Sequence, residues 1–166
     1  MPAPRRYSLV LPSEAHTLAL ASALAQVVPP GIEIHLVGEL AAGKTAFARG
    51  FLGALGHRGA VKSPTFTLVE TYAIEPRQGL RTVHHFDLYR LGDPAELHYM
   101  GFEDYRQADA ICLIEWPSRG GRLLAPSVTV SLEISGLESR RVTVEFDGCV
   151  AEEIVAEFET RIANIE

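Results

Sequence analysis

Eight consecutive residues in the first third of the chain combine residue types suited to holding phosphate groups. They are Gly38-Glu39-Leu40-Ala41-Ala42-Gly43-Lys44-Thr45, and they satisfy the pattern G-x-x-x-x-G-K-[ST] of the Walker A phosphate loop. Successive backbone N–H groups of such a loop can point at phosphate oxygens, and Lys44 would add a positive charge beside the terminal phosphates. The hydroxyl of Thr45 suits the magnesium ion that accompanies a nucleoside triphosphate. The segment therefore predicts a site for ATP or ADP with Mg²⁺.

The segments on either side of this loop are those that a phosphate loop requires. Residues 32–37 form a short apolar run that predicts a buried strand, and residues 46–55 have the apolar spacing of a helix. This order places the loop at the positive end of the helix, where an anion is stabilised. The alternative is a glycine-rich turn between a strand and a helix that binds nothing.

An acidic residue ends each of two further predicted strands. Asp87 follows residues 80–86, and Glu115 follows the nearly continuous apolar run 110–114, which is typical of a central parallel strand. Ligands of open α/β sheets bind outside the carboxyl ends of the strands. We therefore expect Glu115 to contact Mg²⁺ opposite Thr45 and Asp87 to be a catalytic acid or base, although a carboxylate at a strand end can also simply face solvent.

Four more residues are candidates for the surroundings of the site. Ser63 and Thr65 stand where a loop meets a predicted strand, a position that suits a switch segment sensing the terminal phosphate and equally suits ordinary turn chemistry. Trp116 either walls the site or packs in the core. His85 either touches the site or is a structural histidine, and its neighbour His84 must point to the opposite face of the strand, which argues against a shared zinc ion.

The remaining elements predict an α/β fold with a P-loop NTPase-like sheet of mixed direction, which contains an antiparallel hairpin and is flanked by helices. The hairpin pairs residues 65–72 with residues 80–86 around a turn at Gln78-Gly79. The other expected elements are an edge strand at 7–11, a helix at 13–28 with Ser13 as its N-cap, a short helix at 93–100, strands at 127–134 and 141–146, and a helix at 151–162.

Composition narrows the classes of protein that this chain can represent. Its 166 residues, 47% of them hydrophobic, are enough for one substantial core, so we expect residues 1–166 to be a single domain. The net charge of −6 argues against a broad nucleic-acid-binding surface. No run of 18 apolar residues and no signal-peptide pattern is visible, so we expect a cytoplasmic protein without a membrane span, whose Cys112 and Cys149 are reduced thiols.

Several blocks of sequence occur in an order that general phosphate-loop proteins do not share. The blocks are Gly38 to Thr45, Phe47 with Arg49-Gly50, Val61 to Val69 with its Ser-Pro-Thr-Phe core, His85-Phe86-Asp87-Leu88-Tyr89-Arg90-Leu91, and Ile114-Glu115-Trp116-Pro117. Together these blocks resemble the bacterial TsaE (YjeE) family, and the resemblance covers about residues 7–146.

The resemblance implies a small ATPase in the biosynthesis of threonylcarbamoyladenosine, the modified base beside the anticodon of certain tRNAs. It also implies that the protein acts together with the TsaB and TsaD proteins and contacts tRNA only through that complex. Carried over by motif position, Lys44 and the loop would bind phosphates, Thr45 and Glu115 would bind Mg²⁺, and Asp87 would serve hydrolysis. Turnover by the isolated chain is expected to be slow.

The resemblance has three further implications for single residues. Ser63 and Thr65 fall in the switch-like loop of the family, and Ser13 lies in the segment expected to adjoin adenine. Ala41 stands where the family usually has glycine. The loop can keep its shape only if this position does not need a positive φ, and we expect it to tolerate the alanine because the Walker pattern leaves the position free.

Two other functions remain open at this point. A small P-loop kinase would share the loop but needs a lid with arginines and an acceptor-binding domain, and the short β-rich middle of the chain offers no obvious lid. A non-hydrolytic assembly module would use bound nucleotide only to hold its shape. Phosphate release without a phosphorylated acceptor separates the ATPase from the kinase. The variants Glu115→Ala and Asp87→Ala address the assembly module, because turnover that survives both would contradict the chemistry assigned to these acids.

Overall fold

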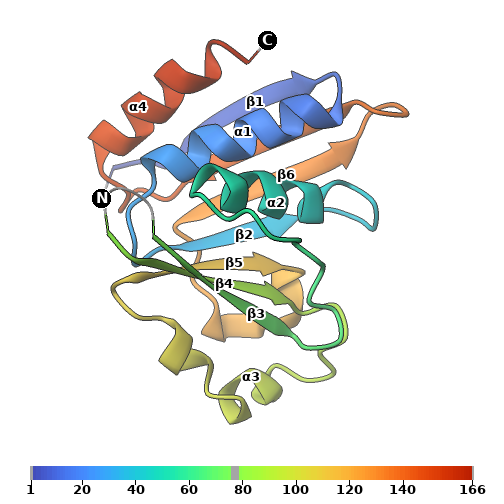
Figure 1. Cartoon of the computed structure of the whole chain (residues 1–166), viewed down its shortest axis with the longest axis vertical. Helices are drawn as coiled ribbons and strands as arrows, with labels where there is room; N and C mark the ends of the chain where they lie inside the picture. The colour runs from blue at the N-terminus through green and yellow to red at the C-terminus, as the bar shows by residue number, and fades with distance from the viewer. Residues whose placement is uncertain (1, 76–78, 166) are drawn as a thin grey trace.

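A single seven-stranded sheet runs through the computed structural model, which describes residues 2–75 and 79–165 (Figure 1). The strand order is β1-β7-β6-β2-β5-β4-β3. The strands are β1 (Arg5–Leu11), β2 (Glu33–Val37), β3 (Val69–Ile74), β4 (Arg81–Asp87), β5 (Ala110–Glu115), β6 (Val128–Ile134) and β7 (Arg140–Phe146). The helices are α1 (Glu14–Val27), α2 (Lys44–Ala54), α3 (Ala95–Tyr99) and α4 (Glu152–Ile162), and short 3₁₀ turns lie at Phe102–Tyr105, Pro117–Arg119 and Gly121–Leu123.

The centre of the sheet is parallel and its flanks are antiparallel. Strand β2 pairs in parallel with both β5 and β6, and β5 pairs in parallel with β4. Strand β3 pairs antiparallel with β4, while β7 pairs antiparallel with both β6 and β1. The predicted mixed sheet with an antiparallel hairpin is confirmed. Because β2, β4 and β5 run the same way, their carboxyl ends meet at one edge of the sheet.

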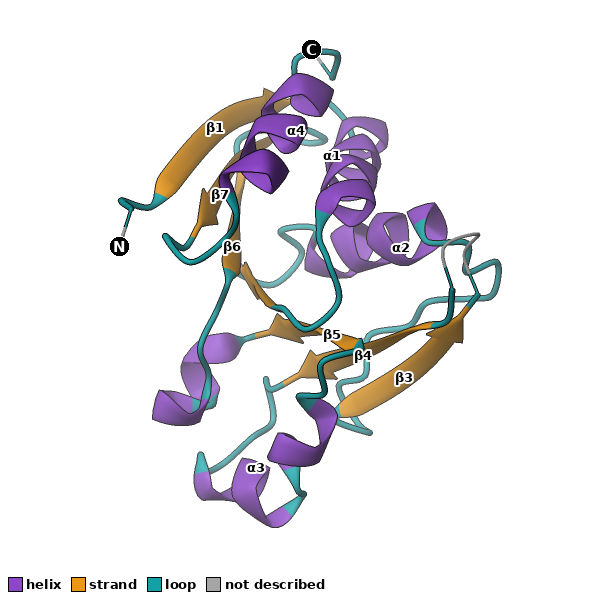
Figure 2. Cartoon of the chain, turned by 90° about the vertical axis from the view of Figure 1, so that its left-hand side faces the viewer, coloured by secondary structure: helices purple, strands orange, loops and turns teal. Residues whose placement is uncertain are grey.

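The helices pack on the two faces unequally. Helices α1, α2 and α4 cover one face, and α3 lies on the other side beside β3 and β4 (Figures 1 and 2). The larger core lies under α1, α2 and α4 and includes fully buried Phe47, Phe51 and Phe158. A smaller core under α3 is built on the edge-to-face pair Phe86 and Phe102, whose ring centroids are 5.2 Å apart. These cores fix the strand ends that carry the polar residues described below.

Where only one face of the sheet is covered, the sequence alternates. In β6 the buried Val128, Val130 and Leu132 face the helices, and the intervening residues are half-buried or exposed. This period of two is the pattern of a half-covered sheet.

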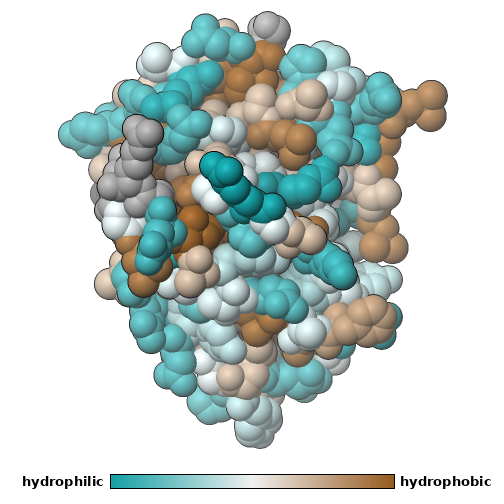
Figure 3. All heavy atoms as spheres, in the orientation of Figure 1, coloured by the Kyte–Doolittle hydropathy of each residue, from teal (hydrophilic) through white to brown (hydrophobic). Residues whose placement is uncertain are grey.

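The face of the molecule seen in Figure 3 is largely hydrophilic, with small separated hydrophobic patches.

The predicted strand at residues 65–72 is wrong in its first half. Residues 65–68 form a turn, in which the N–H of Leu68 donates to the carbonyl of Pro64 at 2.8 Å, and β3 starts only at Val69. Leu68 has a φ of +66°. The alternation of polar and apolar residues continues through this turn, but the Thr65 hydroxyl is bonded to Asp87, and that contact bends the chain away from the ladder. The expected turn at Gln78-Gly79 includes residue 78, which lies outside the described residues.

Ser13 occupies the predicted N-cap position of α1 but caps it only through its backbone. Its carbonyl accepts from the N–H groups of His16 and Thr17, whereas its hydroxyl lies 2.8 Å from His16 Nδ1. The side chain makes no capping hydrogen bond. Within the described ranges, every helix is too short or too polar to cross a bilayer.

Candidate nucleotide-binding site

The predicted phosphate loop leaves the carboxyl end of the central strand β2 and enters α2 at Lys44. Gly43 at the start of α2 has a φ of +107°, which side chains rarely permit. Gly38 is required for a different reason, because a Cβ there would lie 2.7 Å from the carbonyl oxygen of Leu132. The two fixed glycines of the motif therefore serve a left-handed turn and a close backbone approach.

Ala41 adopts a left-handed conformation, with a φ of +66°, so the expectation that this position avoids positive φ is wrong. The neighbouring carbonyls are held by Arg140 at the start of β7. Its Nε donates to the Ala42 carbonyl at 2.9 Å and its Nη2 donates to the Ala41 carbonyl at 3.2 Å. These bonds brace the loop in a conformation that costs an alanine about 1–2 kcal/mol.

Replacing Ala41 by glycine is expected to raise the free energy of unfolding by up to about 1 kcal/mol, because relief of the left-handed strain outweighs the added freedom of glycine in the unfolded chain. Urea denaturation measures the change. Ala46→Gly, within α2, is the matched control, and it should lower the free energy of unfolding by about 0.5–1 kcal/mol. Equal losses in both variants would contradict the strain.

Lys44 lies at the centre of the loop and is almost fully buried, with 5% of its surface exposed. Its Nζ donates to the carbonyls of Gly38 and Glu39 at 2.5 and 2.7 Å and lies 4.3 Å from the centre of the Trp116 ring. Burial lowers the pKa of Lys44, and the negative charges of Glu115 and Asp87 oppose that shift. Trp116 therefore stands as a wall of the site, and its φ of +56° turns the chain sharply after β5.

The pairing of β4 with β5 brings the two predicted acids together. Asp87 lies directly opposite Glu115 in the parallel register, and the two residues are 3% and 2% exposed at the carboxyl ends of the strands. Glu115 Oε1 accepts from the Thr45 hydroxyl at 3.5 Å, and its Oε2 lies 2.6 Å from His85 Nε2. Residues from three separate segments thus converge on one point.

Asp87 is the acceptor for three donors. Its Oδ2 accepts from the hydroxyls of Ser63 and Thr65 at 2.7 and 2.9 Å, and its Oδ1 accepts from the Tyr89 N–H at 3.0 Å. The two hydroxyls also lie 2.8 Å from each other. The segment that precedes β3 is therefore attached to the carboxylate that sequence analysis singles out for hydrolysis.

These residues surround a cavity of about 340 Å³. Its lining consists of Glu14, Leu40, Ala41, Gly43, Lys44, Thr45, Ala46, Ser63, Thr65, Asp87, Tyr89, Glu115, Trp116 and Arg140. Ser13 and His85 are not in the lining, since Ser13 faces His16 and His85 stands behind Glu115. Sequence reasoning gave no signal for Glu14. Tyr89 lies in one of the sequence blocks but was given no role there, and the sequence shows Arg140 only as a basic residue beside the predicted strand 141–146.

The polar atoms suit a hard divalent cation that is bound jointly with phosphates. Thr45 Oγ1 and Glu115 Oε1 are oxygen ligands of the kind that Mg²⁺ prefers. Over residues 2–75 and 79–165 the structure contains no group of three or more His, Cys, Asp or Glu side chains that could hold a metal by itself. The residues present therefore fit Mg²⁺ that arrives with a nucleotide.

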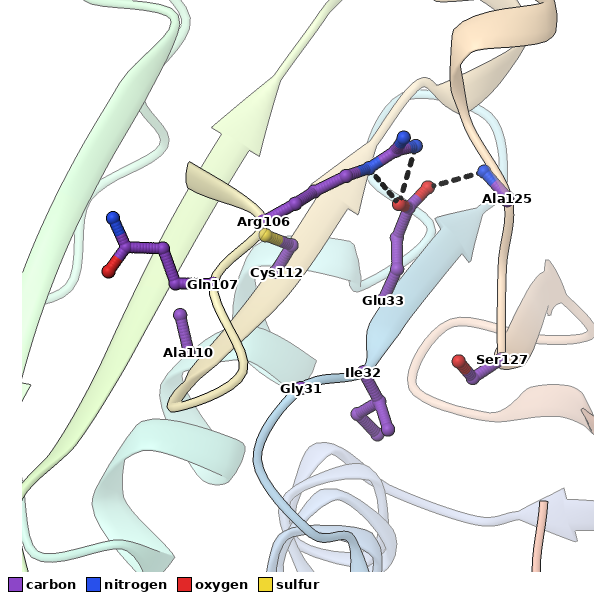
Figure 4. A pocket seen from close by; sticks show the side chains of 9 residues that line it. All are labelled: Gly31, Ile32, Glu33, Arg106, Gln107, Ala110, Cys112, Ala125 and Ser127. Carbon is purple, nitrogen blue, oxygen red and sulfur yellow. Dashed lines mark hydrogen bonds and ion pairs between the residues drawn. The ribbon is translucent and has the colours of Figure 1, made fainter. Parts of the chain in front are cut away.

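A second cavity, of about 300 Å³, lies at the opposite ends of the strands, where β2 begins (Figure 4). Buried Glu33 is its main polar feature. Glu33 accepts from Arg106 Nε at 3.1 Å and from the Ala125 N–H at 2.9 Å, and His35 Nε2 lies 2.6 Å away. Burial raises the pKa of Glu33, but the His35 hydrogen bond and the Arg106 charge outweigh it and hold the pKa below its ordinary value.

Glu33 is expected to make stability depend on acid pH. A carboxyl group whose folded pKa is lowered contributes stability fully above its unfolded pKa of about 4.3, and this contribution is lost as pH falls through the folded value. The free energy of unfolding of Glu33→Gln should therefore lie below that of the parent at pH 7 and approach it at pH 3, as measured in urea. Glu145→Gln, on the exposed side of β7, is the control; a gap independent of pH would contradict the assignment.

A phosphate loop between a central strand and a helix, facing acids at neighbouring parallel strand ends, defines a P-loop NTPase-like α/β protein. The crystal structure of Bacillus subtilis YdiB has the same fold, with a TM-score of 0.77, 25% identity and coverage of 96% of this chain and 98% of that one. The family described as "Threonylcarbamoyl adenosine biosynthesis protein TsaE" matches residues 11–143. The chain therefore belongs to the TsaE family.

Individual relatives support the same assignment. A Haemophilus influenzae protein named "tRNA threonylcarbamoyladenosine biosynthesis protein TsaE" is 47% identical over 110 residues, which span 66% of this chain and 66% of that protein. Proteins of the same name from Rickettsia felis and Bacillus subtilis are 39% and 37% identical, over 76% and 67% of this chain and 72% and 65% of theirs. Family and fold together imply that the chain binds a nucleotide.

Proposed function

We propose that this chain is a Mg²⁺-dependent ATPase that serves the biosynthesis of threonylcarbamoyladenosine in tRNA, as one domain spanning residues 1–166 and located in the cytoplasm. The observation that carries the proposal is the convergence of Lys44, Thr45, Asp87 and Glu115 on one cavity, since these residues come from α2, β4 and β5. The pathway follows from the names of the relatives.

The phosphates of ATP would occupy the phosphate loop. Lys44 Nζ, which donates to Gly38 and Glu39 carbonyls within the loop, would turn to the terminal phosphate oxygens. Thr45 and Glu115 would hold Mg²⁺ together with those phosphates. When bound, the ion neutralises charge that develops on the phosphate oxygens during transfer.

The base and sugar of the nucleotide would extend toward the start of α1. A smaller cavity of about 140 Å³ adjoins the phosphate loop there, and Gly43 and Arg140 line both cavities. Glu14 and Thr17 from α1, Ala46 from α2, and Leu137 and Glu138 from the β6–β7 turn complete its lining. The adenine pocket would therefore lie beside Ser13, with Glu14 and Thr17 as its nearer side chains.

Asp87 would orient the attacking water and accept its proton. In the structure its Oδ2 is occupied by the Ser63 and Thr65 hydroxyls, so a water must replace at least one of them or bind beside them. Arg140 is committed to the carbonyls of Ala41 and Ala42. Turnover is therefore slow in the isolated chain, and contact with the TsaB and TsaD proteins, which bring the tRNA, is expected to move Ser63 and Thr65 and raise the rate.

Calorimetry and phosphate release test the proposal. The parent should bind ATP and ADP in the presence of Mg²⁺ and release inorganic phosphate slowly, and the release should accelerate when TsaB and TsaD are added. Appearance of the phosphate on an added small-molecule acceptor would indicate a kinase instead. Tight binding without release, alone or with partners, would indicate an assembly module, and no binding of either nucleotide would refute the site itself.

A further inference from the structure

His85 lies behind the cavity, on β4, and is completely buried. Its Nε2 lies 2.6 Å from Glu115 Oε2 on the neighbouring strand. A carboxylate only accepts hydrogen bonds, so the hydrogen of this bond sits on Nε2 of the imidazole. The contact leaves Oε1 of Glu115 directed at Thr45, 3.5 Å away.

The sheet register accounts for this contact. Asp87 and Glu115 are paired residues of the parallel ladder, and His85 precedes Asp87 by two positions, so all three side chains lie on the same face of the sheet. His84 must point to the other face, where its Nδ1 meets the Thr71 hydroxyl at 2.8 Å. Adjacent histidines on one strand thus have unrelated surroundings.

The second nitrogen of His85 indicates that filling space in the core does not explain why a histidine stands at this position. Nδ1 has no hydrogen-bond partner within the part of the chain that the structure describes, although it is fully buried. An unpaired buried polar atom is destabilising, and an apolar side chain of similar length would fill the space without that cost. The bond from Nε2 to Glu115 is what distinguishes histidine at this position.

We propose that His85 is a positioning residue for Mg²⁺: it holds Oε2 of Glu115, so that Oε1 faces Thr45 and the phosphate loop before any ligand arrives. The inference rests on the proposed function of the site. Mg²⁺ demands near-ideal octahedral geometry, and a free glutamate side chain loses conformational entropy when it is fixed. A carboxylate that is already fixed by a buried neighbour avoids that loss at the moment of binding.

A pair of substitutions of equal length separates the hydrogen bond from the packing. His85→Gln keeps an N–H donor at the reach of Nε2, whereas His85→Met has similar shape and no donor. The affinity for Mn²⁺ in the presence of ADP is measured from the electron paramagnetic resonance signal of the free ion. This affinity should be at least about tenfold lower for His85→Met than for the parent. His85→Gln and the control His84→Met should stay within about threefold of the parent.

Hydrolysis supplies a second readout. The Mg²⁺ concentration that gives half-maximal turnover should rise in His85→Met in parallel with the weaker Mn²⁺ binding, while kcat at saturating Mg²⁺ should change little. A general loss of structure would lower kcat instead. If His85→Met does not fold, His85→Asn takes its place with the same expected result, because its amide stops short of Glu115.

Equal Mn²⁺ affinity in the parent and in the folded His85→Met or His85→Asn protein would overturn the inference, as would equally weak binding by His85→Gln and His85→Met. Both results leave ATP binding by the parent intact. Failure of the parent itself to bind Mn²⁺ with ADP would instead remove the proposed function and this inference together.

Discussion

Asp87→Asn is expected to lower the rate of ATP hydrolysis about 100-fold or more, while the affinity for ADP and ATP stays within a few-fold of the parent. The loss follows from the removal of the proposed base, since a positioned general base contributes about 10²- to 10⁴-fold. Asparagine has the same shape and can still accept the Ser63 or Thr65 hydroxyl, so the fold around β4 should persist. Single-turnover phosphate release measures the effect separately from product dissociation.

Asp109→Asn is the control for this prediction, because Asp109 is exposed just before β5, at the end of the strand away from Glu115. It should leave turnover unchanged. A variant Asp87→Asn that hydrolyses ATP at the parental rate would show that Asp87 only anchors the segment at Ser63 and Thr65, and that water is activated elsewhere.

Lys44→Met is expected to weaken ATP binding and to reduce hydrolysis about 100-fold or more. The methionine keeps the length of the side chain but removes the one ammonium that the phosphate loop places beside the terminal phosphates, and a preorganised donor of this kind is worth about 10²- to 10³-fold in rate. Two buried acids would then face the triphosphate with their charge less compensated. Calorimetric titration with ATP and Mg²⁺ gives the affinity, and phosphate release gives the rate.

Lys62→Met serves as the control for Lys44→Met, since Lys62 is exposed in the loop before Ser63. Its affinity for ATP should match that of the parent. Parental affinity and turnover in Lys44→Met would contradict the assignment of the phosphates to this loop.

Local patterns predicted the parts of this fold that are set by short stretches of chain. The apolar run before the Walker motif and the apolar positions of α2 gave a strand and a helix within one or two residues of their observed bounds. The continuous apolar run at 110–114 gave the central parallel strand, and with it the location of Glu115 at a carboxyl end. These predictions hold because burial on both faces of a strand selects apolar residues directly.

Contacts between distant segments account for what the patterns missed. The alternation at residues 65–68 is compatible with a strand, but the Thr65 hydroxyl donates a hydrogen bond to Asp87, which lies 22 positions further along the chain. The local pattern gives no sign of this contact. Ala41 has a positive φ, and the Arg140 side chain that bonds its carbonyl comes from a segment 99 residues away. Buried Glu33 in β2 was expected to be part of a short buried strand, but nothing in the sequence indicated Arg106 as its partner.

The hydrogen bonds from Arg140 to the Ala41 and Ala42 carbonyls can form only after β7 has been synthesised, so the phosphate loop acquires its final shape late. The guanidinium reaches the Ala42 carbonyl across a separation of 98 residues, so a nascent chain that has emerged as far as α2, or even β6, carries the whole motif without its support. Domains form as units once enough chain is available. A fragment that stops before β7 should therefore contain every residue of the motif and still lack a competent phosphate site, so nucleotide capture requires β7 in addition to the motif itself.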